Sequence, residues 1–134
     1  PNLLPEGMRE AVEDAKGIKV YVSNIMTQMG ETLGYSAADH LEAINGHMGS
    51  NVIDFIILNE EDIKGRVSDY YSRNDMTIVE SDRERLKEMG ATVVTDDHLV
   101  QIDDEGAVRH NNKVLAEIIY DIALKEISTL QYKK

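Results

Sequence analysis

Ile53-Asp-Phe-Ile-Ile-Leu58 is the stretch of sequence that decides the fold, because five of its six side chains are apolar. An almost unbroken apolar run of this length is typical of a strand covered on both faces, as strands of parallel sheets are. Residues 18–23 (IKVYVS) and 91–95 (ATVVT) are two further candidate strands, and segments with helical spacing separate them from the first. Strands that alternate with helices predict an α/β fold with an open, mostly parallel, doubly wound (Rossmann-like) sheet that has helices on both faces.

Capping motifs mark where the helices between these strands begin. Ser36 with Asp39 three residues later predicts one helix start as a short version of the capping box, and Ser81 with Glu84 predicts another. Glycines past their ends predict that these helices stop at Gly49 and Gly90. The remaining predicted elements are a helix over 5–15, a helix over 61–73 weakened by Gly65, a short strand over 76–79, a small hairpin of 99–102 with 107–109 turning at Gly106, and a C-terminal helix capped by Asn111 or Asn112. The apolar stripe of that last helix consists of Val114, Leu115, Ile118, Ile119, Ile122 and Ile127.

Composition places the chain among globular proteins. Its 134 residues suit a single α/β domain over 1–134, and 42% hydrophobic with 29% charged residues exclude disordered and fibrous classes. Cysteine is absent, which excludes disulfides, thiolate nucleophiles, thiolate zinc sites and iron–sulfur clusters. No apolar run approaches the roughly 20 residues of a membrane span, and no signal-peptide pattern opens the chain. These features predict a cytoplasmic protein without a membrane span.

The charge balance excludes a second group of functions. Fourteen Lys and Arg stand against 25 Asp and Glu, a formal net charge of −11. Nucleic-acid binders gather cations along one face to displace phosphate counterions, so no nucleic-acid partner is predicted. The charge balance does not exclude a small anionic ligand, because backbone N–H groups and one or two arginines can build a local binding site.

The predicted sheet indicates where such a ligand would bind. Ligands of open α/β sheets lie beyond the carboxyl ends of the strands, which directs attention to the loops 24–34, 59–61, 80–81 and 95–98. The longest loop, Asn24 to Gly34, enters the helix at Ser36, whose N-terminus favours a phosphate. Gly30 would allow backbone to approach a ligand closely. Its neutral donors and acceptors are Asn24, Thr27, Gln28 and Thr32. The alternative interpretation is a polar surface loop that caps a helix, and the loop is not a P-loop because it lacks the lysine and the glycine spacing.

Three strings carry a resemblance to a known family: PNLLPEGMREAV at 1–12, VYVSNIMTQMGETLGYSAADH at 20–40 and RHNNKVLAEII at 109–119. They resemble the YvcK/CofD-like family of gluconeogenesis factors, and the T-Q-x-G-E-T stretch at 27–32 is typical of the branch resembling YvcK. The family's N-terminal glycine-rich nucleotide-binding turn is not in this sequence. The resemblance therefore implies the C-terminal part of a longer nucleotide-binding protein.

The YvcK-like branch implies a regulatory protein that binds UDP-sugars such as UDP-N-acetylglucosamine and is linked to gluconeogenic growth, cell shape and cell-wall synthesis in bacteria. The alternative is the transferase branch, which moves a phospholactyl group onto a deazaflavin. The positions that match the family and are expected to bind the ligand are Asn24, Thr27, Gln28, Gly30, Glu31, Thr32, Asp39, His40, Arg109 and His110. Asn111 stands where the family usually has Asp, which weakens a metal or acid–base role there.

The chemistry-bearing residues favour binding over catalysis. Glu31 and Asp39 could form an acid–base pair, but a ligand hydroxyl contact for Glu31 and a helix cap for Asp39 are favoured. His40 and His47 share a helix face without a third ligand nearby, so no metal site and no cofactor are predicted. Arg109 is expected to contact an anionic ligand; the alternative is a surface ion pair with an acid of its own hairpin. A chain that is only part of a longer protein would also expose strand edges, which allows a homo-oligomer.

Overall fold

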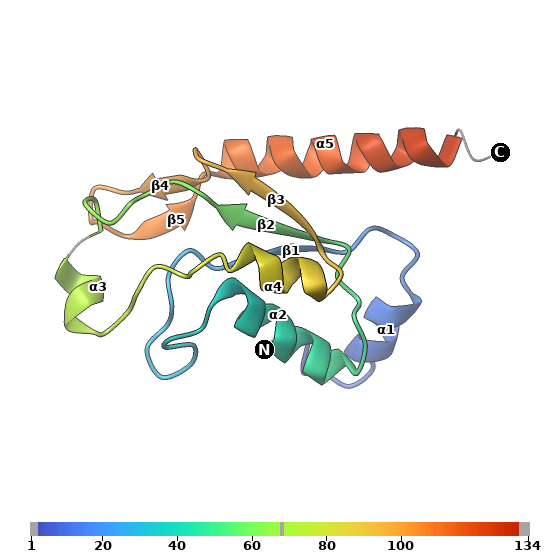
Figure 1. Cartoon of the computed structure of the whole chain (residues 1–134), viewed down its shortest axis with the longest axis horizontal. Helices are drawn as coiled ribbons and strands as arrows, with labels where there is room; N and C mark the ends of the chain where they lie inside the picture. Colours follow the sequence, from blue (N-terminus) through green and yellow to red (C-terminus); the bar gives the residue numbers. More distant parts are fainter. Residues whose placement is uncertain (1–2, 68, 132–134) are drawn as a thin grey trace.

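β2 (Phe55–Asn59) is the central strand of a three-stranded parallel sheet in the computed structural model, which describes residues 3–67 and 69–131 (Figure 1). It pairs with β1 (Val20–Val22) on one side and β3 (Thr92–Asp96) on the other. The middle residues Ile56, Ile57 and Leu58 are buried, as the apolar run predicts for a strand covered on both faces. The parallel α/β sheet is therefore confirmed.

Two helices cover one face of this sheet. α2 (Ala37–Met48) and α4 (Arg83–Glu88) connect the strands and pack against Ile56 and Leu58, and Leu41 and Leu86 are fully buried between them. The capping box predicted for α2 is present, because Ser36 Oγ accepts from Asp39 N and the Asp39 carboxylate accepts from Ser36 N. The helix ends at Gly49, whose φ of 75° lies in the left-handed region that glycine adopts without strain.

The opposite face carries α5 (Asn112–Gln131), which runs along the sheet and past it (Figure 1). Four residues of the predicted stripe pack against Ile57 and its neighbours: Val114, Leu115, Ile118 and Ile122. Ile119 is exposed instead, and the side chain of Ile127 lies outside the described residues, as do Pro1 and Asn2 of the N-terminal string. Asn111 is the cap, since its Oδ1 accepts from Lys113 N and Val114 N. Helices on both faces are thus confirmed.

The predicted hairpin before α5 is also present. β4 (Val100–Ile102) and β5 (Val108–His110) pair antiparallel, with Gln101 opposite Arg109, and Gly106 turns with a φ of 82°. The hairpin packs against the start of the loop after β1 through Ile25 and Met26. The N-terminal helix is α1 (Met8–Asp14), which is shorter than predicted. No helix in the described chain is long and apolar enough to cross a membrane.

Three local predictions are wrong. The helix over 61–73 exists only as α3 (Asp69–Arg73), because Asp62 Oδ1 accepts from Lys64 N in a turn and Ile63 is drawn into the core. The strand over 76–79 is reduced to one antiparallel bridge between Ile78 and Met26.

The third error concerns the start of α4. Asp82, not Ser81, precedes the helix, and no side chain caps it. The Asp82 carboxylate instead accepts from the backbone N–H of Ala38 on α2. A contact between residues 44 apart thus replaces the local capping box.

Candidate functional site

A cleft of about 880 Å³ opens beside the carboxyl ends of the strands. Three segments form its walls: Gly34 to Ser36 before α2, Glu60 to Lys64 after β2, and Met76 to Asp82 before α4. Its inner wall is apolar, with Met26, Ile63 and Ile78. The cleft therefore lies at three of the segments to which the predicted sheet directs attention, although the loop after β1 contributes only Met26 and Gly34 to its lining.

Thr27 is not at the surface, contrary to the expectation of an exposed binding loop. It is 1% exposed, its N–H donates to Thr77 O at 2.8 Å, and its Oγ1 accepts from Thr77 N at 2.8 Å. The segment 77–79 runs beside the loop, and Val79 N donates to Ile25 O. The hydroxyl of Thr27 thus stands in for a backbone acceptor and fixes the loop.

The next residues of the loop form a turn of their own. Thr32 Oγ1 accepts from Gln28 N at 2.9 Å, and Thr32 N donates to Gln28 O at 3.0 Å. Gly30 has a φ of 77°, which the turn requires, and the side chains of Gln28 and Glu31 are exposed. This turn leaves Gln28 and Glu31 accessible to a ligand.

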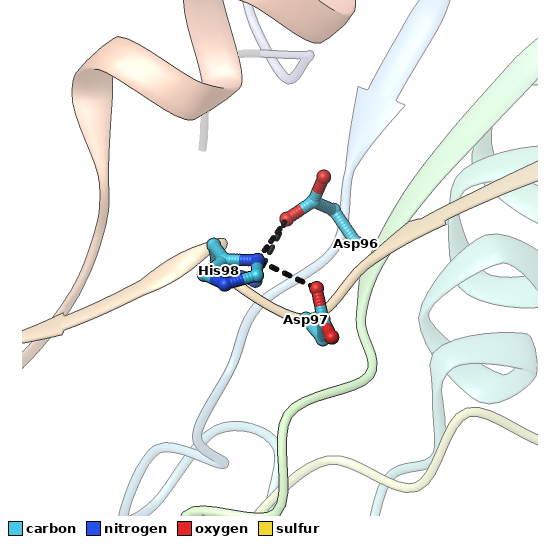
Figure 2. A group of neighbouring side chains, drawn as sticks. All are labelled: Asp96, Asp97 and His98. Atoms are coloured by element: carbon cyan, nitrogen blue, oxygen red, sulfur yellow. Dashed lines mark hydrogen bonds and ion pairs between the residues drawn. The ribbon is translucent and has the colours of Figure 1, made fainter.

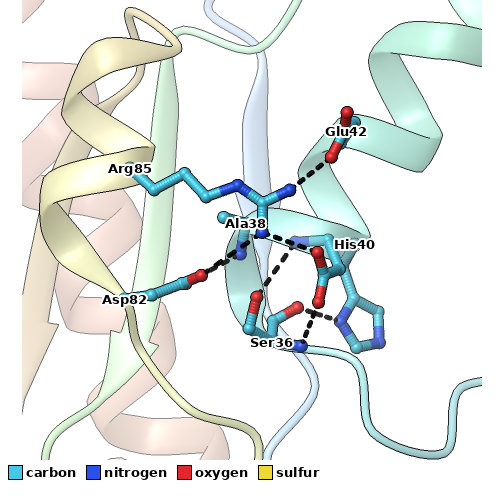
Figure 3. Close-up of polar contacts among 7 residues, drawn as sticks. Ser36, Ala38, His40, Glu42, Asp82 and Arg85 are labelled. Atoms are coloured by element: carbon cyan, nitrogen blue, oxygen red, sulfur yellow. Dashed lines mark hydrogen bonds and ion pairs between the residues drawn. The ribbon is translucent and has the colours of Figure 1, made fainter.

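The start of α2 is occupied by protein acceptors. Ala37 N donates to Glu80 O. Ala38 N donates to Asp82 Oδ1, and Asp39 N donates to Ser36 Oγ (Figure 3). The first three N–H groups of the helix are therefore satisfied, and they are the ones that a bound phosphate would need. The expectation of a phosphate at the Ser36 end of this helix is corrected accordingly.

Arg85 ties α4 to that same helix start. Its guanidinium lies between three carboxylates, bonding Asp39 at 2.6 Å and Glu42, with Asp82 at 3.7 Å (Figure 3). The hydrogen bond from Ser36 N and then the Arg85 guanidinium lower the pKa of Asp39 from 3.8 to about 2. Asp39 is thus a charged structural cap, as its favoured interpretation requires.

His40 lies behind this cap and is 8% exposed. Its Nδ1–H donates to Ser36 O at 2.7 Å, and the Tyr35 ring meets it edge-on with centroids 5.4 Å apart. Its buried Nε2 has no hydrogen-bond partner among the described residues. His47 donates to Leu3 O from the far end of the helix, so the two histidines hold separate carbonyls.

Arg109 and His110 line a second, open hollow of about 610 Å³ together with Gln101, Asp103, Val108 and Asn112. His110 Nε2–H donates to Ser23 O at 3.0 Å, which fixes the hairpin to the end of β1 beside Asn24. Arg109 is largely exposed, and its Nε donates to Asp103 Oδ2 at 3.2 Å. The backbone N–H of Ala107, more than Arg109, lowers the pKa of Asp103.

The predicted site residues thus fall into separate groups. His110 bonds the carbonyl of Ser23, the residue before Asn24. Gln28, Gly30, Glu31 and Thr32 make the turn of the loop, and Asp39 and His40 serve the start of α2. The carboxylates of the large cleft were not singled out by the sequence: Glu60, Glu61, Asp62, Glu80 and Asp82. Their only signal is their place in loops that follow or precede a strand or helix at the ligand edge.

One further group of side chains lies at the end of β3. Asp96, Asp97 and His98 each offer a ligand atom, all within 4.8 Å of one another (Figure 2). His98 Nδ1 already contacts Asp97 at 2.6 Å, and Asp96 Oδ1 accepts from His98 N. Because Asp97 and His98 are largely exposed, this group can form within the loop without a metal ion.

Comparisons with known proteins agree with this fold. The family model described as 2-phospho-L-lactate transferase CofD matches residues 1–99. The gluconeogenesis factor of Bacillus subtilis is 42% identical over 94% of this chain and 39% of its own length. The gluconeogenesis factor of Halalkalibacterium halodurans is 37% identical over 98% of this chain and 40% of its own. A crystal structure of a Bacillus halodurans protein matches with a TM-score of 0.83 and 38% identity, over 90% of this chain and 38% of that one.

The chain spans about two fifths of the length of these curated relatives, a share that fits a C-terminal part. The family model covers most of the 134 residues, and the similarity to the crystal structure extends over both the sheet and its helices. The chain belongs to the CofD family, and its relatives in that family are named gluconeogenesis factor.

Proposed function

We propose that the chain is the C-terminal part of a cytoplasmic regulatory protein that binds a nucleotide sugar of the UDP-N-acetylglucosamine type and is linked to carbon metabolism, cell shape and cell-wall synthesis. Relatives named gluconeogenesis factor support the link to carbon metabolism. The T-Q-x-G-E-T stretch at 27–32, which resembles the YvcK-like branch, supports the ligand class. A binding role without catalysis is favoured.

The observation that carries this proposal is the guanidinium of Arg109. Its side chain is 71% exposed, and only Nε is engaged, by Asp103. Among the described residues, its two terminal nitrogens have no partner, so a planar fork of donors remains for a diphosphate. The neighbouring His110 fixes this strand to the end of β1, so the hairpin that carries Arg109 adjoins the ligand edge of the sheet.

The test is calorimetry of the full-length protein with UDP-N-acetylglucosamine. Arg109→Ala is expected to weaken affinity at least about tenfold, roughly 1.4 kcal/mol, and Arg109→Lys to restore only part of the loss. Asp103→Asn is the matched control, because it removes the ion pair and leaves the guanidinium in place. Unchanged affinity in Arg109→Ala, with a small stability loss that fades in salt, would assign Arg109 to a surface ion pair instead.

The second candidate is a transferase. The matching family model carries the description of a 2-phospho-L-lactate transferase, which favours an enzyme that moves a phospholactyl group onto a deazaflavin. Such an enzyme needs a divalent ion and a guanosine donor by resemblance. The test incubates the full-length protein with the guanosine donor, the deazaflavin and magnesium and measures the released guanosine nucleotide by chromatography. Release of that nucleotide would favour this candidate over the regulator.

A further inference from the structure

We infer that the 880 Å³ cleft receives an uncharged, hydroxyl-bearing part of the ligand, a glycosyl or ribosyl group, and rejects its diphosphate. This inference rests on the proposed function and deepens it. Its basis is the charge of the cleft: five carboxylates and one ammonium, that of Lys64, line it. A phosphate placed there would meet more carboxylates than cations, even with the arginines that pair with three of them.

The arginines near the cleft offset part of this charge but leave Asp62 and Glu80 without an arginine partner among the described residues. Arg83 forms an ion pair with Glu60, Arg66 forms one with Glu61, and Arg85 is surrounded by carboxylates at the start of α2. Each guanidinium is thus engaged by at least one carboxylate. The N–H groups at the start of α2, which could hold an anion, are also engaged.

Glu80 is the carboxylate that best fits a ligand contact. Its side chain lines the cleft, is exposed and has no partner among the described residues. Its backbone is held in place, because Glu80 O accepts from Ala37 N at 2.8 Å. A carboxylate on a fixed backbone accepts strong hydrogen bonds from hydroxyl groups, and the partly exposed Ile78 can pack against the C–H face of a sugar ring.

The cleft also adjoins the end of β1. Ile78, Val79 and Ser81 line both the cleft and a narrow gap that reaches Ser23 and Asn24 at the end of β1. The carbonyl of Ser23 is the one that His110 holds. This gap holds only about 10 Å³, the space of about one water molecule, so it places the cleft next to the end of β1 without giving a ligand a passage.

The experiment measures the affinity of the full-length protein for UDP-N-acetylglucosamine and for UDP by calorimetry, with wild type and Glu80→Gln. Glu80→Gln is expected to weaken binding of UDP-N-acetylglucosamine about fivefold to tenfold, with an unchanged melting temperature. If UDP binding is unchanged, the hydroxyls belong to the glycosyl group; an equal loss for UDP assigns them to the ribosyl group. Glu88→Gln is the matched control, an exposed glutamate of α4 that does not line the cleft.

The sign of the effect separates the alternatives. A gain in affinity for either ligand in Glu80→Gln would mean that the carboxylate repels a nearby phosphate, and this inference would be wrong. Wild-type binding that Glu80→Gln leaves unchanged for both ligands also overturns the inference and leaves the proposed function standing. Absence of wild-type binding overturns the proposed function, and the inference with it.

Discussion

At the scale of single residues, Thr27 shows how a side chain expected to serve a ligand can serve the fold. Its Oγ1 accepts the N–H of Thr77, so Thr27→Val, which keeps the volume, leaves that N–H without its acceptor. We expect the variant to lose about 1–2 kcal/mol of unfolding free energy. Thr27→Ser keeps the oxygen and is expected to recover most of that loss in urea unfolding of the same chain.

Gln28 provides the comparison for Thr27 in the same loop. Its side chain is exposed, and on the Gln28 side its two hydrogen bonds with Thr32 use only the backbone N–H and C=O. Gln28→Ala is therefore expected to leave the free energy of unfolding within about 0.5 kcal/mol of wild type. A Thr27→Val variant as stable as Gln28→Ala would contradict the structural role of the Thr27 hydroxyl.

Asp39 gives the molecule a pH dependence whose sign follows from its pKa, lowered to about 2. A carboxyl whose pKa is lower in the folded than in the unfolded state stabilises the fold at any pH above its unfolded-state pKa. This stabilisation is lost as the pH falls through the folded-state pKa. It is expected to disappear between about pH 4 and about pH 2. NMR titration of the carboxyl carbon should show a higher Asp39 pKa in Arg85→Met, still below 3.8 because Ser36 N continues to donate.

Glu42 allows a control for that titration. Glu42→Gln removes another partner of Arg85 without removing either hydrogen bond to Asp39. It is expected to change the Asp39 pKa less than Arg85→Met does. An Asp39 pKa that Arg85→Met leaves unchanged would show that Ser36 alone sets it.

At the scale of elements, α2 contains one glycine, Gly46, and ends at another, Gly49, and the two have opposite roles. Gly46 lies on the exposed face within the helix, and a Cβ there would meet nothing within 4 Å. Gly46→Ala is therefore expected to stabilise the protein by about 0.5–1 kcal/mol. Gly49 ends the helix at a φ of 75°, where a Cβ would lie 2.5 Å from Arg9 Nη2, so Gly49→Ala is expected to destabilise by about 1 kcal/mol or more.

Thermal or urea unfolding of the two alanine variants tests this pair. Both variants add the same methyl group to the same helix region, so the difference isolates backbone conformation and local space. Stability changes of equal sign would contradict the assignment of Gly49 as a left-handed cap.

The same elements show which structural information is local in the sequence. β2 was predictable because burial on both faces requires an apolar run, and α2 because its cap residues are three positions apart. The helix over 61–73 failed because its outcome depends on Ile63 entering a cluster with Met26 and Val100, which helical spacing does not contain. The prediction of a capping box for α4 failed for a related reason, since the Asp82 carboxylate accepts a hydrogen bond from Ala38 N on α2.

The candidate site was predictable to a similar extent. The sheet topology located the loops of the ligand edge, because strand ends in a parallel sheet meet at one edge. The individual contacts were not predictable from the sequence. Thr27 bonds Thr77, 50 positions away, and His110 bonds Ser23, 87 positions away. The acidic lining of the cleft likewise results from three segments whose meeting only the fold reveals.

At the scale of the whole molecule, the surface of α5 is the feature that a longer protein would alter. Its exposed side includes Tyr120, 64% exposed, and Leu124, 46% exposed, while Ile118 and Ile122 face the sheet. The sheet also has two edge strands, β1 and β3, with unpaired backbone groups. The relatives are more than twice as long as this chain, so we propose that their additional segments cover part of this surface.

The isolated chain 1–134 is therefore expected to self-associate and to bind UDP-N-acetylglucosamine more weakly than the full-length protein. Apolar side chains on a helix and open strand edges both gain from a second copy, and by resemblance the phosphates are held largely by an N-terminal glycine-rich turn that is not in this sequence. Light scattering after size exclusion should show a mass that rises with concentration, and Tyr120→Lys should lower it. Glu117→Lys, which also places a lysine on the exposed part of α5 but keeps both apolar side chains, is the control. A monomer at every concentration that binds the UDP-sugar as tightly as the full-length protein does would show that these surfaces and the ligand site are complete without further segments.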